Sequence, residues 1–178
     1  YKLVFSKNGR YLASVGSEVA RIWNTSDWSK ESEWELEGTI RAVLFADNDR
    51  QLIVAGERDE RGFLERWDWK TGNRLQSVSE VPRSVDSLGL SRDERLLVTA
   101  SDAEQRIYTW SWPAGKSLQT ISLDEEGSDP VLHPDGKLLL REVHAHAWRA
   151  ERLGALPRDE DPKEAPKEAQ DRSEEHHV

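Results

Sequence analysis

A tryptophan phrase repeats along this chain at nearly regular intervals, and it restricts the possible folds more than any other feature. In the clearest copy, residues 66–78, a strand-like run ends at Trp67 and the polar residues 70–73 reverse the chain. Tryptophan is a large core residue with a single N–H group to satisfy. Related tryptophans give spacings of 44, 43 and 38 residues along the series Trp23, Trp67, Trp110 and Trp148. The spacing predicts a structural role for these residues in a protein of four repeated units.

A second phrase marks the first half of each unit. A strand ends on a bulky residue, a polar turn follows, and a basic residue opens a second, apolar strand. The copies occupy residues 5–14, 45–54, 90–99 and 132–141. Asn, Asp, Gly and Pro in the turns are what hairpins require. We therefore expect four short strands in each unit, and for the fourth unit strands at 129–132, 137–141, 143–148 and 151–156.

The body of the chain is predicted to be all-β, because no segment shows apolar residues at helical spacing over ten or more positions. A period of 40 to 45 residues with four strands per repeat is typical of propeller blades. On the two recurring phrases and the Trp67-Asp68 pair, residues 1–156 resemble the WD-repeat β-propeller family. A β-sandwich with accidental repetition is the competing all-β interpretation.

The resemblance implies about four β-propeller blades of four antiparallel strands each. We expect their approximate bounds at 1–38, 39–80, 81–125 and 126–156. Rings in this family usually contain more blades, so we expect a partial propeller, with further blades supplied by a part of the protein before Tyr1 or by another subunit. A compact four-bladed ring is the alternative.

The chain departs from the family in its polar network. The family often places a serine in the second strand, within a hydrogen-bonded set that includes the tryptophan. That position holds Ser14, Val54, Thr99 and Arg141. We therefore expect the blades to depend on apolar packing more than on this network.

Composition excludes several classes of function. The net charge of −9 argues against nucleic acid or an anionic membrane as a partner. The chain has no cysteine, no apolar run near the roughly 20 residues that span a bilayer, and no signal peptide, so we expect a cytoplasmic protein. Because it has no methionine and begins at Tyr1, we expect a processed or partial chain. The acidic segment 157–178, with no aromatic residue, is predicted to be a disordered tail.

The sequence predicts neither a cofactor nor catalysis. Residues 89–93 lack the closing glycine of a nucleophile elbow, and no Walker or dinucleotide glycine motif is present. His144 and His146 would share one face of a strand, so they are candidate metal ligands, with His133 as a third. The alternative, which we favour, is that they occupy ordinary polar strand positions, as Arg21 and Tyr108 do in other units.

Binding is the best-supported function. Loops between strands two and three, and between strand four and the next unit, should emerge at one end of the blades, where recognition residues tend to lie. We therefore predict a non-catalytic scaffold that binds a protein partner; the alternative is an accessory propeller of a larger enzyme, such as a kinase or peptidase. The predicted partner-binding residues are Glu57, Arg58, Arg61, Arg83, Asp102 and Glu104.

Overall fold

The computed structural model describes residues 2–16, 18–123, 131–143 and 147–153. These residues form strands and turns and contain no helix, which confirms the all-β fold class. The strands make four antiparallel sheets, and within each sheet the strands follow one another in chain order. The predicted tail, residues 157–178, lies outside the described residues.

The first three sheets each have four strands. Sheet 1 consists of β1 (Lys2–Phe5), β2 (Tyr11–Val15), β3 (Val19–Asn24) and β4 (Lys30–Glu35). Sheet 2 consists of β5 (Thr39–Ala46), β6 (Gln51–Arg58), β7 (Arg61–Asp68) and β8 (Asn73–Ser77). Sheet 3 consists of β9 (Ser87–Leu90), β10 (Leu96–Ser101), β11 (Arg106–Ser111) and β12 (Lys116–Ser122). Sheet 4 consists of β13 (Val131–Leu132), β14 (Leu138–Val143) and β15 (Ala147–Arg152).

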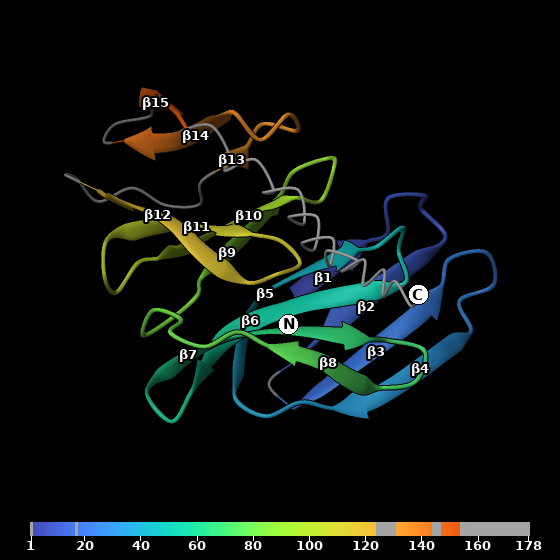
Figure 1. Ribbon diagram of the computed structural model, residues 1–178. Coiled ribbons are helices and arrows are strands. Elements are labelled where there is room, and N and C mark those ends of the chain that lie inside the picture. The colour runs from blue at the N-terminus through green and yellow to red at the C-terminus, as the bar shows by residue number, and fades with distance from the viewer. Residues whose placement is uncertain (1, 17, 124–130, 144–146, 154–178) are drawn as a thin grey trace, which may run out of the picture.

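The sheets stack side by side as propeller blades do, with their first strands innermost (Figure 1). Strand β5 lies beside β1 and β9, and β13 lies beside β9. Three apolar clusters fill the spaces between successive sheets. The first joins sheets 1 and 2 around Ile22, Leu52 and Trp69; the second joins sheets 2 and 3 around Leu64 and Trp110. The third lies on sheet 3 and includes Leu153.

The repeating tryptophans occupy one register position in the first three sheets. Trp23, Trp67 and Trp110 are each paired across the strands with a leucine of the preceding strand. The sequence predicts that apolar packing matters more than the serine–tryptophan network, but part of this network is present in sheets 1 and 3. The indole Nε1 of Trp23 donates to Ser14 Oγ at 2.9 Å, and that of Trp110 donates to Thr99 Oγ1 at 3.1 Å.

The fourth sheet differs from the prediction. The predicted third strand, 143–148, is wrong, because residue 143 ends β14 and β15 runs from 147 to 152. Residues 151 and 152, assigned to a fourth strand at 151–156, belong to β15 and pair with β14. Leu139 is opposite Glu151, so the register places Glu151, and not Trp148, at the position of the repeating tryptophan.

The turn between the first two strands of each sheet has a left-handed residue at the same place. These residues are Gly9 (φ 72°), Asp49 (φ 65°), Glu94 (φ 58°) and Gly136 (φ 72°). Left-handed backbone favours glycine, since a Cβ atom costs about 1–2 kcal/mol there. The two carboxylates therefore occupy strained positions, and their contacts indicate why.

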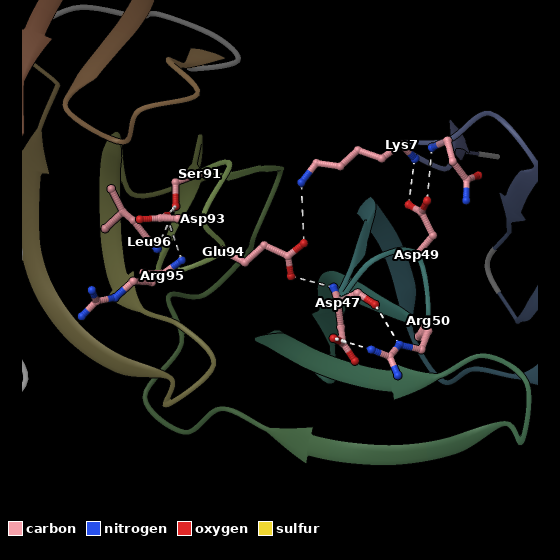
Figure 2. A network of polar contacts seen from close by, with 10 residues as sticks. Lys7, Asp47, Asp49, Arg50, Ser91, Asp93, Glu94, Arg95 and Leu96 are labelled. Atoms are coloured by element: carbon pink, nitrogen blue, oxygen red, sulfur yellow. Dashed lines mark hydrogen bonds and ion pairs between the residues drawn. The ribbon is translucent and has the colours of Figure 1, made fainter.

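Each carboxylate joins its own turn to the turn of the preceding sheet (Figure 2). Asp49 accepts hydrogen bonds from the backbone N–H groups of Lys7, at 2.7 Å, and Asn8, at 3.2 Å. Glu94 accepts one from the Asp47 N–H at 2.6 Å and lies 3.6 Å from Lys7 Nζ. These bonds satisfy turn groups at the sheet boundary, where apolar packing alone would not.

Candidate interaction surface

The loop end of the molecule is the end at which the predicted partner-binding residues lie. We define it by the turn 58–61, the connections 36–38 and 78–86, and the turn 102–105. Strands β6 and β7 pair from Gln51–Asp68 to Arg58–Arg61, so only two residues form the tip of their hairpin. Both tip residues are left-handed, Asp59 at φ 51° and Glu60 at φ 61°, and both are exposed. This tight hairpin fixes the backbone that displays Asp59, Glu60 and Arg61.

Arg58 makes contacts within the protein. Its guanidinium donates from Nη2 to the Glu37 carbonyl oxygen at 2.8 Å and lies 4.7 Å from the ring centroid of Phe63. Its Nη1 is 3.3 Å from Glu65 Oε1, and only 25% of the side chain is exposed. Arg58 therefore fastens the connection between sheets 1 and 2 to strand β7.

Glu65 is a buried charge that was not among the residues predicted from the sequence. Its side chain is 1% exposed, and Oε1 lies 2.9 Å from Arg74 Nη1 as well as near Arg58. Its Oε2 accepts the indole N–H of Trp67 at 3.1 Å. In sheets 1 and 3 a hydroxyl of the second strand accepts this N–H, but sheet 2 has Val54 there. Glu65 supplies the acceptor that valine lacks, and two arginines balance its charge.

A shallow hollow of about 580 Å³ lies between the connection 37–39 and the β6–β7 hairpin. Arg41 lines the hollow, with Nη2 3.2 Å from Glu57 Oε2 and Nη1 3.3 Å from Asp86 Oδ1. Asp59 and Glu60 also line it, and both are exposed. The lining therefore combines an arginine held by ion pairs with exposed carboxylates.

The connection 78–86 is tied to the β10–β11 turn through Glu104. The backbone N–H of Arg83 donates to Glu104 Oε1 at 2.6 Å, and the Tyr108 hydroxyl donates to Oε2. These two bonds, the first being the stronger influence, lower the pKa of the Glu104 carboxyl from its usual 4.5. Burial, together with the bond to Glu104, raises the pKa of the Tyr108 hydroxyl above 10.0.

A second set of bonds secures the same connection. Asp86 Oδ2 accepts the Ser84 hydroxyl at 2.8 Å and the Asp102 backbone N–H at 2.9 Å. The Ser84 and Ser101 hydroxyl oxygens lie 3.3 Å apart. Since Asp86 also meets Arg41, this carboxylate links sheets 2 and 3 at the loop end.

The structure thus divides the six predicted residues into two neighbouring groups. Glu57, Arg58 and Arg61 lie at the β6–β7 hairpin, whereas Arg83, Asp102 and Glu104 lie where the connection 78–86 meets the β10–β11 turn. Reasoning from the sequence missed the residues that support both groups: Arg41, Glu65, Arg74 and Asp86. The sequence signal for Glu65 was Val54 at the usual serine position, which leaves the Trp67 N–H without its usual acceptor.

Comparisons with known proteins agree with the repeated blades. Human WD repeat-containing protein 3 is 25% identical over 149 residues, 77% of this chain and 15% of that protein. An Arabidopsis thaliana protein, cell division cycle 20.6, cofactor of APC complex, is 31% identical over 122 residues, 63% of this chain and 28% of its own length. Eukaryotic translation initiation factor 3 subunit I of Nematostella vectensis is 30% identical over 96 residues, or 53% of this chain.

The chain is similar to WD-repeat proteins over as much as 77% of its length. No protein-family profile matches it, in keeping with its divergent motifs. It spans between 15% and 28% of the length of these relatives. The tryptophan N–H donates to a hydroxyl in sheets 1 and 3 and to the Glu65 carboxylate in sheet 2.

Only one of the three candidate metal ligands lies within the described residues. His144 and His146 lie outside the described residues, whereas His133 is in the β13–β14 turn, its Nδ1 2.8 Å from Asp135 Oδ1. The Lys137 N–H, and secondarily His133, lower the pKa of the Asp135 carboxyl. Within the described ranges, no group of three or more His, Asp or Glu side chains is placed to hold a metal ion. The same part of the chain has no helix that is long and apolar enough to cross a membrane.

Proposed function

We propose that this WD-repeat chain is a non-catalytic scaffold that binds a protein partner at its loop end. The observation that carries the proposal is the 580 Å³ hollow, which lies beside a rigid hairpin displaying Asp59, Glu60 and Arg61. A surface held in place by Arg41, Arg58 and Asp86 loses little conformational entropy on binding. Exposed charges of both signs at its rim provide orientation and selectivity.

The names of the relatives are consistent with this proposal. One is a cofactor of a complex and another is a subunit of a translation initiation factor. Both names describe components of larger assemblies, so they favour a binding function for this chain as well. The partners of those relatives need not be partners of this chain.

The proposal is tested by reversing charges on side chains that form no hydrogen bond or ion pair with the described residues. Arg58 is unsuitable because it neutralises buried Glu65, so its reversal would destabilise the fold. The test variant is Arg61→Glu with Arg83→Glu, whose side chains are exposed. The control is Arg92→Glu with Lys116→Glu, an equal charge change at exposed positions of the opposite end.

The measurement is quantitative capture of partners from an extract of the source cells. We expect specific partners to be retained by the control and reduced at least about tenfold by the test variant, as truncation of interface hot spots does. Both variants should melt within a few degrees of the unaltered chain, because exposed substitutions change stability little. Equal capture by the two variants would show that the loop end is not the binding site.

A further inference from the structure

The outer face of sheet 1 carries an apolar surface, which we call the leading face. It consists of the side chains of Leu3, Phe5, Leu12 and Trp23, which alternate with the residues buried against sheet 2. The register places Phe5, Leu12 and Trp23 in one row across three strands. Leu3 is 67% exposed and Phe5 is 60% exposed.

The same row forms the contact with the preceding sheet elsewhere in the molecule. In sheet 2 it consists of Phe45, Leu52 and Trp67, which pack in the cluster shared with sheet 1. In sheet 3 it consists of Leu90, Leu97 and Trp110, which pack in the cluster shared with sheet 2. Since the leading face presents the same types of residue in the same register, it has the composition of a sheet-binding face.

The turn beside the leading face leaves room for a neighbour. A Cβ atom added at Gly136 of sheet 4 would lie 3.3 Å from Ser91 Cβ and 3.5 Å from Leu96 Cδ2, both in the preceding sheet. A Cβ added at the equivalent Gly9 would meet nothing within 4 Å. Glycine at this position therefore allows a close approach that no described residue makes to sheet 1.

One residue sets the leading face apart from the other sheet contacts. In the turn between strands three and four, the left-handed position holds Gly72 in sheet 2 and Gly115 in sheet 3, both at φ 69°. Sheet 1 has Trp28 there, at φ 59°. The equivalence is supported by the same hydrogen bond, from each residue's N–H to the carbonyl four residues earlier, at 2.8 Å for Trp28, 2.9 Å for Gly72 and 2.8 Å for Gly115.

The two glycines have close neighbours on the outer strand of the preceding sheet. A Cβ added at Gly72 would lie 3.3 Å from Trp34 Cβ, and one added at Gly115 would lie 2.9 Å from Val78 Cγ2. Trp28 is 59% exposed and projects a large side chain from the corresponding place. A preceding sheet with a large residue at the Trp34 position would therefore collide with Trp28.

We propose that the leading face binds a further four-stranded blade whose outer strand has a small residue at the position corresponding to Trp34. In the contact between sheets 1 and 2, the large residue lies on the outer strand and the glycine on the turn. At the leading face the large residue, Trp28, lies on the turn, and the small residue lies on the outer strand of the docking blade. Trp28 then fills the space beside that small residue. Trp28 thus determines which blade can dock.

The test uses the full chain with a second copy of residues 1–38 joined ahead of Tyr1. Residues 36–38 already connect sheets 1 and 2, so the added copy keeps a natural connection. In the added copy, Trp34 would face Trp28 of the original sheet. Four chains are compared. The added copy has either tryptophan or alanine at the position of Trp34, and the original sheet has either Trp28 or the substitution Trp28→Gly.

We expect the added alanine copy to raise the melting midpoint of the chain that retains Trp28, by about 4 °C or more. The added tryptophan copy should raise it only in the Trp28→Gly chain. No rise in any chain, or an equal rise with added alanine and added tryptophan, would overturn the proposal.

A thiol probe measures the contact independently of stability. The chain has no cysteine, so Phe5→Cys introduces a single reactive group on the leading face. We expect its labelling to slow about tenfold when the alanine copy covers it, because reaction then requires local opening. Lys116→Cys, exposed and remote, should label at an unchanged rate. Sedimentation of the original chain gives the last outcome: a dimer abolished by Trp28→Gly would identify a second copy as the occupant and overturn the proposal.

Discussion

At the scale of single residues, Glu65 shows how one substitution in a repeat changes its surroundings. With Val54 in the hydroxyl position, the Trp67 N–H is satisfied by a carboxylate, and that carboxylate requires Arg58 and Arg74. The arrangement joins the core of sheet 2 to the connection 36–38 through Arg58. A local exchange in β6 is thereby coupled to the position of the loop end.

We predict that Glu65→Ala destabilises the protein by about 2–4 kcal/mol, since it removes the buried counter-charge of Arg58 and leaves the Trp67 N–H without an acceptor. Adding Val54→Thr should recover part of the loss, because Thr99 serves Trp110 in this way. Urea unfolding measures both effects. Glu33→Ala, at an exposed ion pair with Arg21, is the control and should cost far less. A cost no larger than that of Glu33→Ala would mean that Glu65 is not a stabilising centre.

At the scale of elements, the turns between first and second strands determine how neighbouring sheets meet. Glu94 and Asp49 reach back to the preceding turn, whereas at the boundary of sheets 3 and 4 the Arg92 N–H donates directly to the Pro134 carbonyl at 2.8 Å. This difference between side-chain and backbone bridging follows from the residue at the left-handed position of the turn, which is Gly136 in sheet 4 but Asp49 or Glu94 in sheets 2 and 3. Where the left-handed residue is Asp49 or Glu94, its side chain bridges the two turns. Where it is Gly136, there is no side chain, and the backbones of the two turns form a hydrogen bond directly.

We predict that Asp49→Ala destabilises the protein by about 2–3 kcal/mol, because it removes two hydrogen bonds but keeps a Cβ atom at a left-handed position. Asp49→Gly should cost roughly 1 kcal/mol less, since it removes the backbone strain together with the bridge. Chemical denaturation of the two variants gives the comparison. If Asp49→Ala, which keeps the backbone strain, is as stable as the unaltered chain, the bridge contributes nothing.

The strands of sheets 1 to 3 could be predicted because their signals are local. Turn residues and alternating apolar positions predicted four short strands in each unit, and each of these three sheets has four. In sheet 4 the tryptophan gave the wrong register, because the run 138–140 pairs with 150–152 and leaves Trp148 opposite Glu142.

The contacts of the candidate site could not be predicted from the sequence. They depend on which side chains meet across strands and sheets, as Glu65 does with Arg74 and Arg41 does with Asp86. Such pairs depend on register and on the separation of the sheets, and no short motif encodes them. The sequence indicated loops in which binding residues are expected, but it did not separate Arg58, which contacts Glu37 and Glu65, from exposed Arg61.

At the scale of the whole molecule, the described sheets form a row in which the apolar contacts join each sheet to its neighbours. The stability of such an array is approximately the sum of its units and the contacts between them. Sheet 2 is covered on both faces, by the clusters shared with sheets 1 and 3. Sheet 1 is covered on one face and leaves Leu3 and Phe5 exposed on the other.

We therefore predict a gradient of amide hydrogen exchange along the row. Strands β6 and β7, central in sheet 2 and covered on both sides, should exchange most slowly, because their opening requires the loss of two sheet contacts. Strand β1, at the edge of sheet 1, and β12, at the edge of sheet 3, should exchange first. Peptide-resolved exchange measured by mass spectrometry distinguishes these elements.

Ile53→Ala tests the same prediction by weakening one sheet contact, because Ile53 belongs to the cluster shared with sheet 3. The substitution should accelerate exchange in β6 and β10 more than in β3. Equal acceleration in all sheets would instead indicate that the sheets unfold as a single cooperative unit.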